Sequence, residues 1–176
     1  MIINLVGCIA VGKSTFAKQW VAKHKSWVHL AIDEIREEVV TEALQCHASV
    51  EDTVGYLLLS RAIASKDCII ETTGDWWRLR DLYTPELVHR GIYTIRFEAS
   101  EEECAERAKK RNRVLPAPYD ADEQQAISEY YPVPANLVVD LTGLENPDKV
   151  YQEIEWYIWK AYAFHNAEEV KSSETP

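Results

Sequence analysis

Short apolar runs recur along the chain and alternate with longer segments in which apolar residues have helical spacing. Ile2–Val6 and Cys68–Ile70 are nearly continuous apolar runs, which is typical of strands buried on both faces of a parallel sheet. Three further strands are expected at Trp27–Ile32, Ile92–Phe97 and Asn136–Asp140. The pattern predicts an α/β protein, a three-layer α/β/α sandwich around a five-stranded, mainly parallel sheet.

Helices are expected between these strands, from the apolar spacing and from capping residues. Ser100 and Glu103 have the spacing of a capping box at the start of one of them. Thr84-Pro85 is a position where another is expected to break. The expected helices cover residues 15–23, 33–46, 50–64, 76–89 and 101–113, and a last helix begins at Asn146-Pro147.

The length of 176 residues predicts one domain, residues 1–167, with a substantial core. Residues 113–134 are rich in Pro, Asp and Tyr and predict an insert with a short helix at 123–129. Together with the helix before it, this insert is expected to form a lid at about 104–134. The polar tail 168–176 is expected to be disordered.

Composition and charge narrow the setting of the protein. The net charge of −10 argues against a generally basic surface for coating nucleic acid, although it leaves room for a local basic groove. No apolar run approaches membrane-spanning length, and the N-terminus lacks the pattern of a secretory signal. The four cysteines are scattered, and Cys68 and Cys104 have the pattern of small core residues. A reduced, cytoplasmic location without a membrane partner is therefore expected.

Residues Gly7 to Ser14 match the phosphate-binding loop pattern G-x-x-x-x-G-K-[ST] in full, between a predicted strand and a predicted helix. Glycines let the backbone wrap around phosphates, and the N-terminus of the following helix favours negative charge. Lys13 is expected to reach the β- and γ-phosphates of ATP, and Ser14 to offer its hydroxyl to Mg²⁺. The expected ATP-binding residues of the loop are Gly7, Cys8, Ile9, Ala10, Val11, Gly12, Lys13, Ser14 and Thr15.

Asp33 and Arg36 form a second candidate site, because Asp33 follows the second predicted strand directly and Arg36 lies one helical turn later. A carboxylate at this edge of the sheet is placed to accept a proton from an attacking hydroxyl, and the guanidinium to hold an anionic part of the acceptor. The alternative is a helix N-cap aspartate with a local salt bridge.

These motifs resemble the kinase domain of polynucleotide 5′-kinases and related small P-loop kinases, over nearly all of the chain up to about residue 160. The P-loop marks a large superfamily, and the Asp-x-x-Arg after the second strand narrows it. The residues that carry the resemblance are Gly7 and Gly12-Lys13-Ser14-Thr15, Asp33-Glu34-Ile35-Arg36, Glu71-Thr72-Thr73-Gly74, the arginines Arg107, Arg111 and Arg113, and Leu137–Leu144.

The resemblance implies roles for several residues. It implies that Asp33 is the general base, that Arg36 contacts an acceptor phosphate, and that a lid arginine stabilises the transferred group. Arg111 is the best match for that arginine, with Arg113 as its substitute. The family's third strand usually ends in Asp-x-Thr-Asn, whereas here it ends in Glu71-Thr72-Thr73-Gly74. Glu71 can still order a Mg²⁺-bound water, but the acceptor side is expected to differ.

Further residues near the third strand and in the lid helix are candidates for ligand contacts. Thr72 and the segment Trp76–Arg78 are expected near the acceptor, where Trp76 can stack on a base and Arg78 can grip a phosphate. Core packing of one tryptophan is an equal alternative. Arg107 is explained either by pairing with Glu103 or by packing near the adenine.

The last predicted helix carries an apolar face with aromatic residues on its margin, which predicts either a wide core face or a surface for a homo-oligomer or another partner. Its face consists of Val150, Ile154, Tyr157, Ile158 and Ala161, and the marginal residues are Trp156, Trp159 and Tyr162.

Three functions follow from these features. The first is an ATP-dependent phosphotransferase acting on a hydroxyl of DNA, RNA or a nucleotide, either a 5′-hydroxyl or a hydroxymethylated base in DNA. The second is a kinase for a small metabolite or nucleoside, which the acidic composition favours slightly. The third is a nucleotide-dependent ATPase or switch that transfers nothing. The arginine-bearing lid helix suits a phosphotransferase better than a switch.

Overall fold

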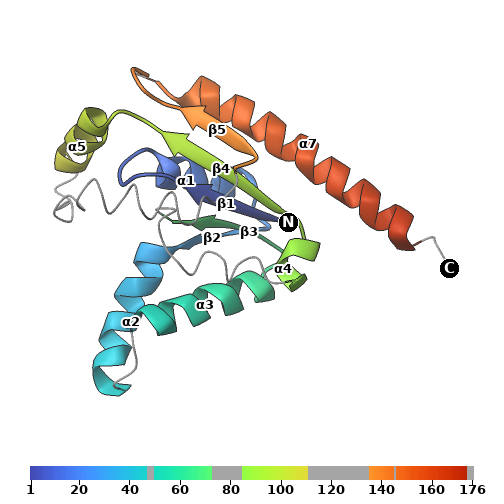
Figure 1. The fold of residues 1–176 in the computed structure, drawn as a ribbon, viewed down its shortest axis with the longest axis horizontal. Helices are drawn as coiled ribbons and strands as arrows, with labels where there is room; N and C mark the ends of the chain where they lie inside the picture. The colour runs from blue at the N-terminus through green and yellow to red at the C-terminus, as the bar shows by residue number, and fades with distance from the viewer. Residues whose placement is uncertain (47–49, 73–84, 111–134, 145, 174–176) are drawn as a thin grey trace.

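The computed structural model describes residues 1–46, 50–72, 85–110, 135–144 and 146–173. A five-stranded sheet forms its centre, with the strand order β2-β3-β1-β4-β5 (Figure 1). Each pair of neighbouring strands is parallel, so the predicted α/β sheet is confirmed. The strands are β1 (Ile2–Val6), β2 (Trp27–Ala31), β3 (Asp67–Glu71), β4 (Ile92–Glu98) and β5 (Leu137–Asp140).

Helices cover both faces of the sheet, as the three-layer prediction requires. On one face, α2 (Ile32–Cys46), α3 (Val50–Ala64) and the short α4 (Pro85–His89) contribute to a shared apolar cluster. On the other face, α1 (Lys13–Lys23), α5 (Glu101–Lys110) and α7 (Asp148–Ser173) contribute to a second cluster. In Figure 1, α2 and α3 lie below the sheet and α7 runs along its opposite side.

Strand β1 shows why the strands read as continuous apolar runs. Ile3 and Leu5 pack into the cluster of α1 and α7, whereas Ile2 and Val6 pack into the cluster of α2 and α3. Successive side chains point to opposite faces, and both faces are covered, so nearly every position is apolar. The exception is Asn4, which is buried and donates its amide to the Thr94 hydroxyl at 3.5 Å.

Helix α7 packs on the sheet through a stripe that differs in part from the prediction. Tyr151, Ile154 and Ile158 are buried in the core, at the i, i+3, i+7 spacing of one helical face. Tyr157 was predicted on that face but is 42% exposed, because it lies one position off the stripe. Trp159 is also partly exposed but stacks its ring on Trp20 of α1, with centroids 5.9 Å apart.

The structure can be compared with only part of what was predicted for the C-terminal tail, the helix 76–89 and the lid. Helix α7 continues to Ser173, so the predicted disordered tail is wrong for residues 168–173, which include the helix formers Glu168, Glu169 and Lys171. The predicted helix 76–89 is described only from Pro85, and the insert with its short helix at 123–129 lies outside the described residues. Among the described helices, none is long and apolar enough to cross a bilayer.

Candidate functional site

The loop between β1 and α1 requires glycine at both of its motif positions. Gly7 has φ 143° and Gly12 has φ 123°, a backbone region that side chains disfavour. A Cβ on Gly7 would lie 2.3 Å from the backbone oxygen of Phe97, and a Cβ on Gly12 would lie 2.9 Å from the Tyr151 hydroxyl. The loop is therefore pressed against β4 on one side and α7 on the other.

The N-terminus of α1 is left free for an anion. Its N-cap is Gly12, which offers no side-chain acceptor, and no acidic residue occupies its first turn; the structure describes this helix in full. The Gly12 carbonyl accepts hydrogen bonds from the amides of Thr15 and Phe16, both at 3.1 Å, and from the Tyr151 hydroxyl at 3.2 Å. The backbone amides at the start of α1 lie at the positive end of the helix dipole, where an anion is stabilised.

Lys13 is buried in the loop and bonds to its backbone. The Lys13 Nζ donates to the carbonyl oxygens of Gly7 at 2.7 Å and Cys8 at 2.8 Å, and the residue is only 6% exposed. Burial lowers the pKa of this ammonium, while the nearby carboxylates of Glu71 and Asp33 oppose that effect. An anion bound in the loop would supply the counter-charge that this buried ammonium needs.

Glu71, the last residue of β3, connects α1 to β2. The Ser14 hydroxyl donates to Glu71 Oε1 at 2.5 Å, and His29 Nε2 lies 3.0 Å from Glu71 Oε2. Burial raises the pKa of Glu71, but the hydrogen bonds from His29 and Ser14 and the charge of Lys13 outweigh it, and the pKa falls below its ordinary value. Glu71 is therefore an anionic, oriented carboxylate beside the lysine and serine of the loop.

The sequence prediction had no role for His29. Its side chain lies on the same face of the sheet as Glu71 because the parallel register pairs Ala31 with Glu71, two residues further along β2. A histidine inside an otherwise apolar strand, two residues before its carboxyl end, was the signal available in the sequence. The register that brings it to Glu71 was not available there.

Asp33 and Arg36 lie together at the start of α2, directly beyond the carboxyl end of β2. Arg36 Nη1 is 3.3 Å from Asp33 Oδ1, which is the local salt bridge of the alternative interpretation; the Asp33 side chain is 61% exposed and that of Arg36 39%. Helix α2 begins at Ile32, so Asp33 lies within the first turn rather than at the N-cap. Because β1, β3 and β2 are neighbouring parallel strands, the loop after β1 and Asp33 after β2 lie at the same edge of the sheet.

Thr72 lies beside β1 at the end of β3, where its amide donates to the Leu5 carbonyl at 3.0 Å. It is 1% exposed, and its hydroxyl has no hydrogen-bond partner among the described residues. The other residues predicted on the acceptor side, Trp76 and Arg78, lie outside the described residues, as do the lid arginines Arg111 and Arg113.

Arg107 of α5 reaches the phosphate-binding loop. Its guanidinium lies 3.5 Å from the Val11 carbonyl, 3.4 Å from the Leu141 carbonyl and 3.7 Å from Glu103. The predicted pairing with Glu103 is thus confirmed. The predicted capping box is formed only in part, because the Glu103 amide bonds to Ser100 Oγ whereas the Glu103 carboxylate accepts from the Gly143 amide.

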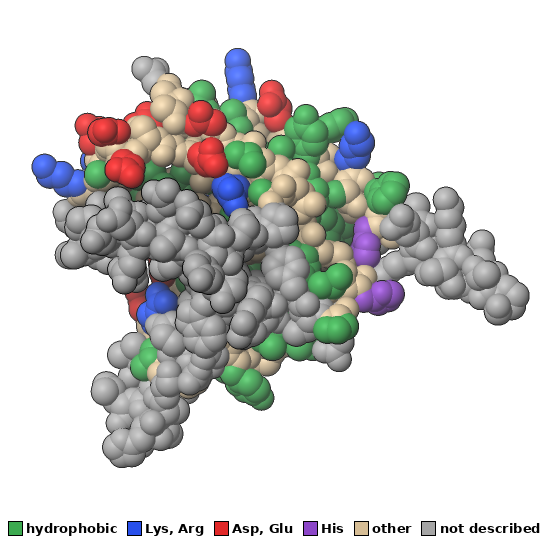
Figure 2. Space-filling model, in the orientation of Figure 1, with side chains coloured by type: hydrophobic (Ala, Val, Ile, Leu, Met, Phe, Trp, Pro, Cys, Tyr) green, Lys and Arg blue, Asp and Glu red, His purple; other side chains and the backbone are tan. Residues whose placement is uncertain are grey.

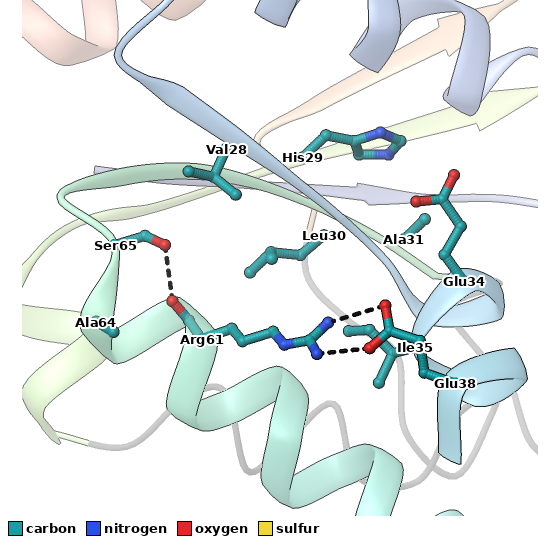
Figure 3. A pocket seen from close by; sticks show the side chains of 10 residues that line it. All are labelled: Val28, His29, Leu30, Ala31, Glu34, Ile35, Glu38, Arg61, Ala64 and Ser65. Carbon is teal, nitrogen blue, oxygen red and sulfur yellow. Dashed lines mark hydrogen bonds and ion pairs between the residues drawn. The ribbon is translucent and has the colours of Figure 1, made fainter. Parts of the chain in front are cut away.

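A pocket of about 370 Å³ lies on the other face of β2, between α2 and α3 (Figure 3). An ion pair at 2.6 Å between Glu38 and Arg61 crosses it. In Figure 3 the ring of His29 points away from this pair, whereas Leu30 points toward it. The pocket is therefore separate from the phosphate-binding loop.

A family model described as "AAA domain" matches residues 2–128, which is more than half of the chain. The chain belongs to this family. Comparison with curated proteins gave no match.

Solved structures similar to this AAA-domain protein are P-loop kinases and related proteins. A shikimate kinase from Bacteroides thetaiotaomicron is 17% identical with a TM-score of 0.61, over 90% of this chain and 98% of that chain. Kti12 from Chaetomium thermophilum in complex with ADP-AlF3 is 15% identical with a TM-score of 0.58, over 92% and 98%. A chain of the Pnkp1/Rnl/Hen1 RNA repair complex is 23% identical with a TM-score of 0.52, over 74% and 45%. The fold is the α/β fold of P-loop NTPases, which these structures share.

Proposed function

We propose that this protein is an ATP-dependent phosphotransferase that moves the γ-phosphate of ATP to a hydroxyl group of a nucleic acid or nucleotide. The observation that carries the proposal is the placement of four side chains at one edge of the sheet: the loop residues Lys13 and Ser14, the carboxylate of Glu71, and that of Asp33. A loop that only bound phosphate would not need a second, exposed carboxylate at this edge.

Nucleotide binding is assigned to the loop and the start of α1. The two glycines hold the backbone against β4 and α7, and α1 offers its uncapped N-terminus. When the triphosphate enters, Lys13 exchanges the carbonyl oxygens of Gly7 and Cys8 for phosphate oxygens. That exchange gives a buried ammonium an anionic partner, so the electrostatic gain is largest where water is excluded.

The residues present fit a magnesium ion. Mg²⁺ prefers oxygen ligands and keeps several of its waters, and Ser14 Oγ and the Glu71 carboxylate stand 2.5 Å apart beside the loop. The Ser14 hydroxyl would be a direct ligand and Glu71 would hold a bound water. Bound there, the ion would neutralise charge on the phosphates. His29 would keep the Glu71 carboxylate oriented through its hydrogen bond.

Asp33 is assigned the role of general base toward the acceptor hydroxyl. It is largely exposed, so it is reachable by an acceptor, and it lies at the edge where the γ-phosphate would point. Arg36 pairs with the Asp33 carboxylate and would contact an anionic group of the acceptor. Transfer then depends on positioning and charge neutralisation, as is usual for phosphoryl transfer.

A small-metabolite or nucleoside kinase is the second candidate, and the surface charge favours it. Figure 2 shows acidic side chains gathered over α5 and the neighbouring ends of β4 and β5. Glu101, Glu102 and Asp140 are among the exposed acidic residues of these elements. Such a surface repels a polyanion, so a nucleic-acid acceptor would have to approach from the side of Asp33 and Arg36.

The test is transfer of label from γ-labelled ATP with magnesium to a panel of oligonucleotides, nucleosides and small alcohols. Label on a DNA or RNA 5′-hydroxyl, or on a hydroxymethylated base, supports the proposal. Label on small acceptors alone replaces it with the second candidate. Release of inorganic phosphate with no labelled acceptor would establish an ATPase and overturn both kinase assignments.

A further inference from the structure

Two cysteines meet between the phosphate-binding loop and the helix that packs against it. Cys8 is the second residue of the loop motif, and Cys104 lies in α5, 96 residues further along the chain. Their sulfur atoms are 2.9 Å apart, and both cysteines are free thiols. The proposed phosphotransfer uses neither sulfur.

The two thiols differ in access to solvent. Cys8 is exposed, whereas Cys104 is only 6% exposed and belongs to the core cluster beneath α1 and α7. Burial raises the pKa of the Cys104 thiol to about 12, so it remains protonated at neutral pH. An oxidant from solvent therefore meets Cys8 first, and the Cys104 sulfur, 2.9 Å away, is in place to attack the oxidised Cys8 sulfur.

We propose that Cys8 and Cys104 form a reversible disulfide that holds the phosphate-binding loop in the conformation in which Lys13 bonds to the Gly7 and Cys8 carbonyls, and that it weakens nucleotide binding. A disulfide needs sulfurs about 2.05 Å apart, so these two must approach by less than about 1 Å. The inference rests on the proposed nucleotide site for its consequence, whereas the disulfide itself rests on the sulfur–sulfur distance and can be tested separately.

The oxidation balances with a peroxide as the oxidant. The Cys8 sulfur attacks one peroxide oxygen, the O–O bond breaks, and a sulfenic acid forms with release of one water. The Cys104 sulfur then attacks the Cys8 sulfur, the S–O bond breaks, and the thiol proton leaves with the hydroxyl as a second water. Both cysteines are oxidised and the peroxide is reduced. A small thiol reverses the reaction by exchange.

The disulfide would act on the nucleotide through the backbone of Cys8. The Cys8 carbonyl accepts a hydrogen bond from the Lys13 ammonium at 2.8 Å, and this bond must break before the ammonium can turn to a phosphate. A tether from Cys8 to α5 would restrict that movement. The preceding residue, Gly7, lies so close to the Phe97 carbonyl that a Cβ would not fit, so the loop cannot move toward β4.

Helix α5 is a firm anchor for such a tether. Cys104 is buried in the core, and its amide closes the first turn of the helix by donating to the Ser100 carbonyl at 3.0 Å. One turn later, Arg107 contacts the Val11 carbonyl of the same loop at 3.5 Å. The disulfide would add a covalent link between two segments that already touch.

The experiment compares reduced protein with protein oxidised by hydrogen peroxide at low equivalents. Peptide mapping without reduction should find Cys8 joined to Cys104, and the intact mass should fall by two hydrogens. Calorimetry with ATP and magnesium should show at least a tenfold weaker affinity after oxidation, and dithiothreitol should restore it. An oxidised protein with no Cys8–Cys104 peptide, or with unchanged ATP affinity, would overturn the proposal.

Matched variants separate this disulfide from other oxidation damage. Cys104→Ala should bind ATP like the reduced wild type and keep that affinity after peroxide, and Cys104→Ser serves if the alanine variant does not fold. Cys68→Ala, at a buried cysteine on the opposite face of the sheet, should respond to peroxide as the wild type does. Peroxide sensitivity that persists in both Cys104 variants would contradict the assignment. Reduced protein that binds no nucleotide would refute the proposed function and the effect of the disulfide on the loop. Peptide mapping would still decide whether the disulfide forms.

Discussion

The charged side chains at the sheet edge are of two kinds. Lys13 and Glu71 lie beside the phosphate-binding loop and are shielded from solvent, whereas Asp33 is exposed on the side proposed for the acceptor. Lys13 is buried and Glu71 is half-buried, and the charge of each affects the pKa of the other, whereas Asp33 pairs with Arg36. Desolvation strengthens charge interactions among the buried groups. Exposure leaves the Asp33 carboxylate accessible to a second substrate.

Replacing Asp33 by asparagine should separate nucleotide binding from transfer. Asp33→Asn removes the proton acceptor but keeps the shape, so we expect transfer to fall roughly 10²–10⁴-fold, the usual scale for a general base. ATP affinity measured by calorimetry should change little. Glu34→Gln is the matched control, since Glu34 is the next carboxylate on α2 and lines the separate pocket of Figure 3. Equal rates in the two variants would remove Asp33 from the mechanism.

The carboxylate of Glu71 should make stability depend on acid pH. Because its pKa in the folded protein lies below the ordinary 4.5, its ionised form contributes stability above about pH 4.5. That contribution is lost as the pH falls through the folded-state value. The free energy of unfolding can be measured with urea at several pH values, in the presence of a chelator and without nucleotide. Between pH 5 and roughly pH 3, the wild type should lose more of this free energy than Glu71→Gln. Parallel curves for the two proteins would refute this assignment.

The elements at the site are held by close backbone approaches rather than by side chains alone. The loop between β1 and α1 passes so near β4 that only glycine fits at position 7, and it passes under α7 at Gly12. Elsewhere a side chain makes the connection: the guanidinium of Arg90, just after α4, donates to the carbonyl of Ala62 in the last turn of α3 and to that of Lys66 just beyond it, both at 2.7 Å.

Adding one methyl group to the loop should test this packing. Gly7→Ala places a Cβ 2.3 Å from the Phe97 oxygen at a φ of 143°, so we expect a loss of about 2–4 kcal/mol in unfolding free energy and much weaker ATP binding. Gly143→Ala is the control, because its φ of 71° is also positive but no atom lies within 4 Å of the added Cβ. We expect it to cost about 1 kcal/mol and to leave ATP binding intact. Similar losses in both variants would mean that backbone strain alone accounts for them.

The molecule as a whole places its site where three chain segments meet. The strand order β2-β3-β1-β4-β5 sets β3 between β1 and β2, so the residues after these three strands share one edge. Ligands of open α/β sheets bind beyond the carboxyl ends of the strands. A ligand at this edge touches elements from both helical layers, and it should therefore stabilise the entire domain.

Nucleotide should raise the thermal stability of the folded chain. At an ATP concentration one hundred times its dissociation constant, binding adds about 2.7 kcal/mol, which corresponds to about 5–11 °C for a domain of this size. Thermal unfolding followed by circular dichroism with ATP and magnesium measures the shift. In Lys13→Ala the shift should shrink or vanish, while Lys18→Ala, on an exposed position of the same helix, should keep it. An equal shift in both variants would contradict the role of Lys13.

The sequence alone determined the sheet of five strands, its helical layers and the position of the phosphate-binding loop, because each depends on local apolar periodicity and on one contiguous motif. It also placed Asp33 beside Arg36, since both lie on one helical turn. The tertiary structure alone decided that His29 bonds to Glu71 and that the sulfur of Cys8 meets that of Cys104. These contacts join residues 42 and 96 positions apart, so they depend on strand register and helix packing, which no local pattern encodes.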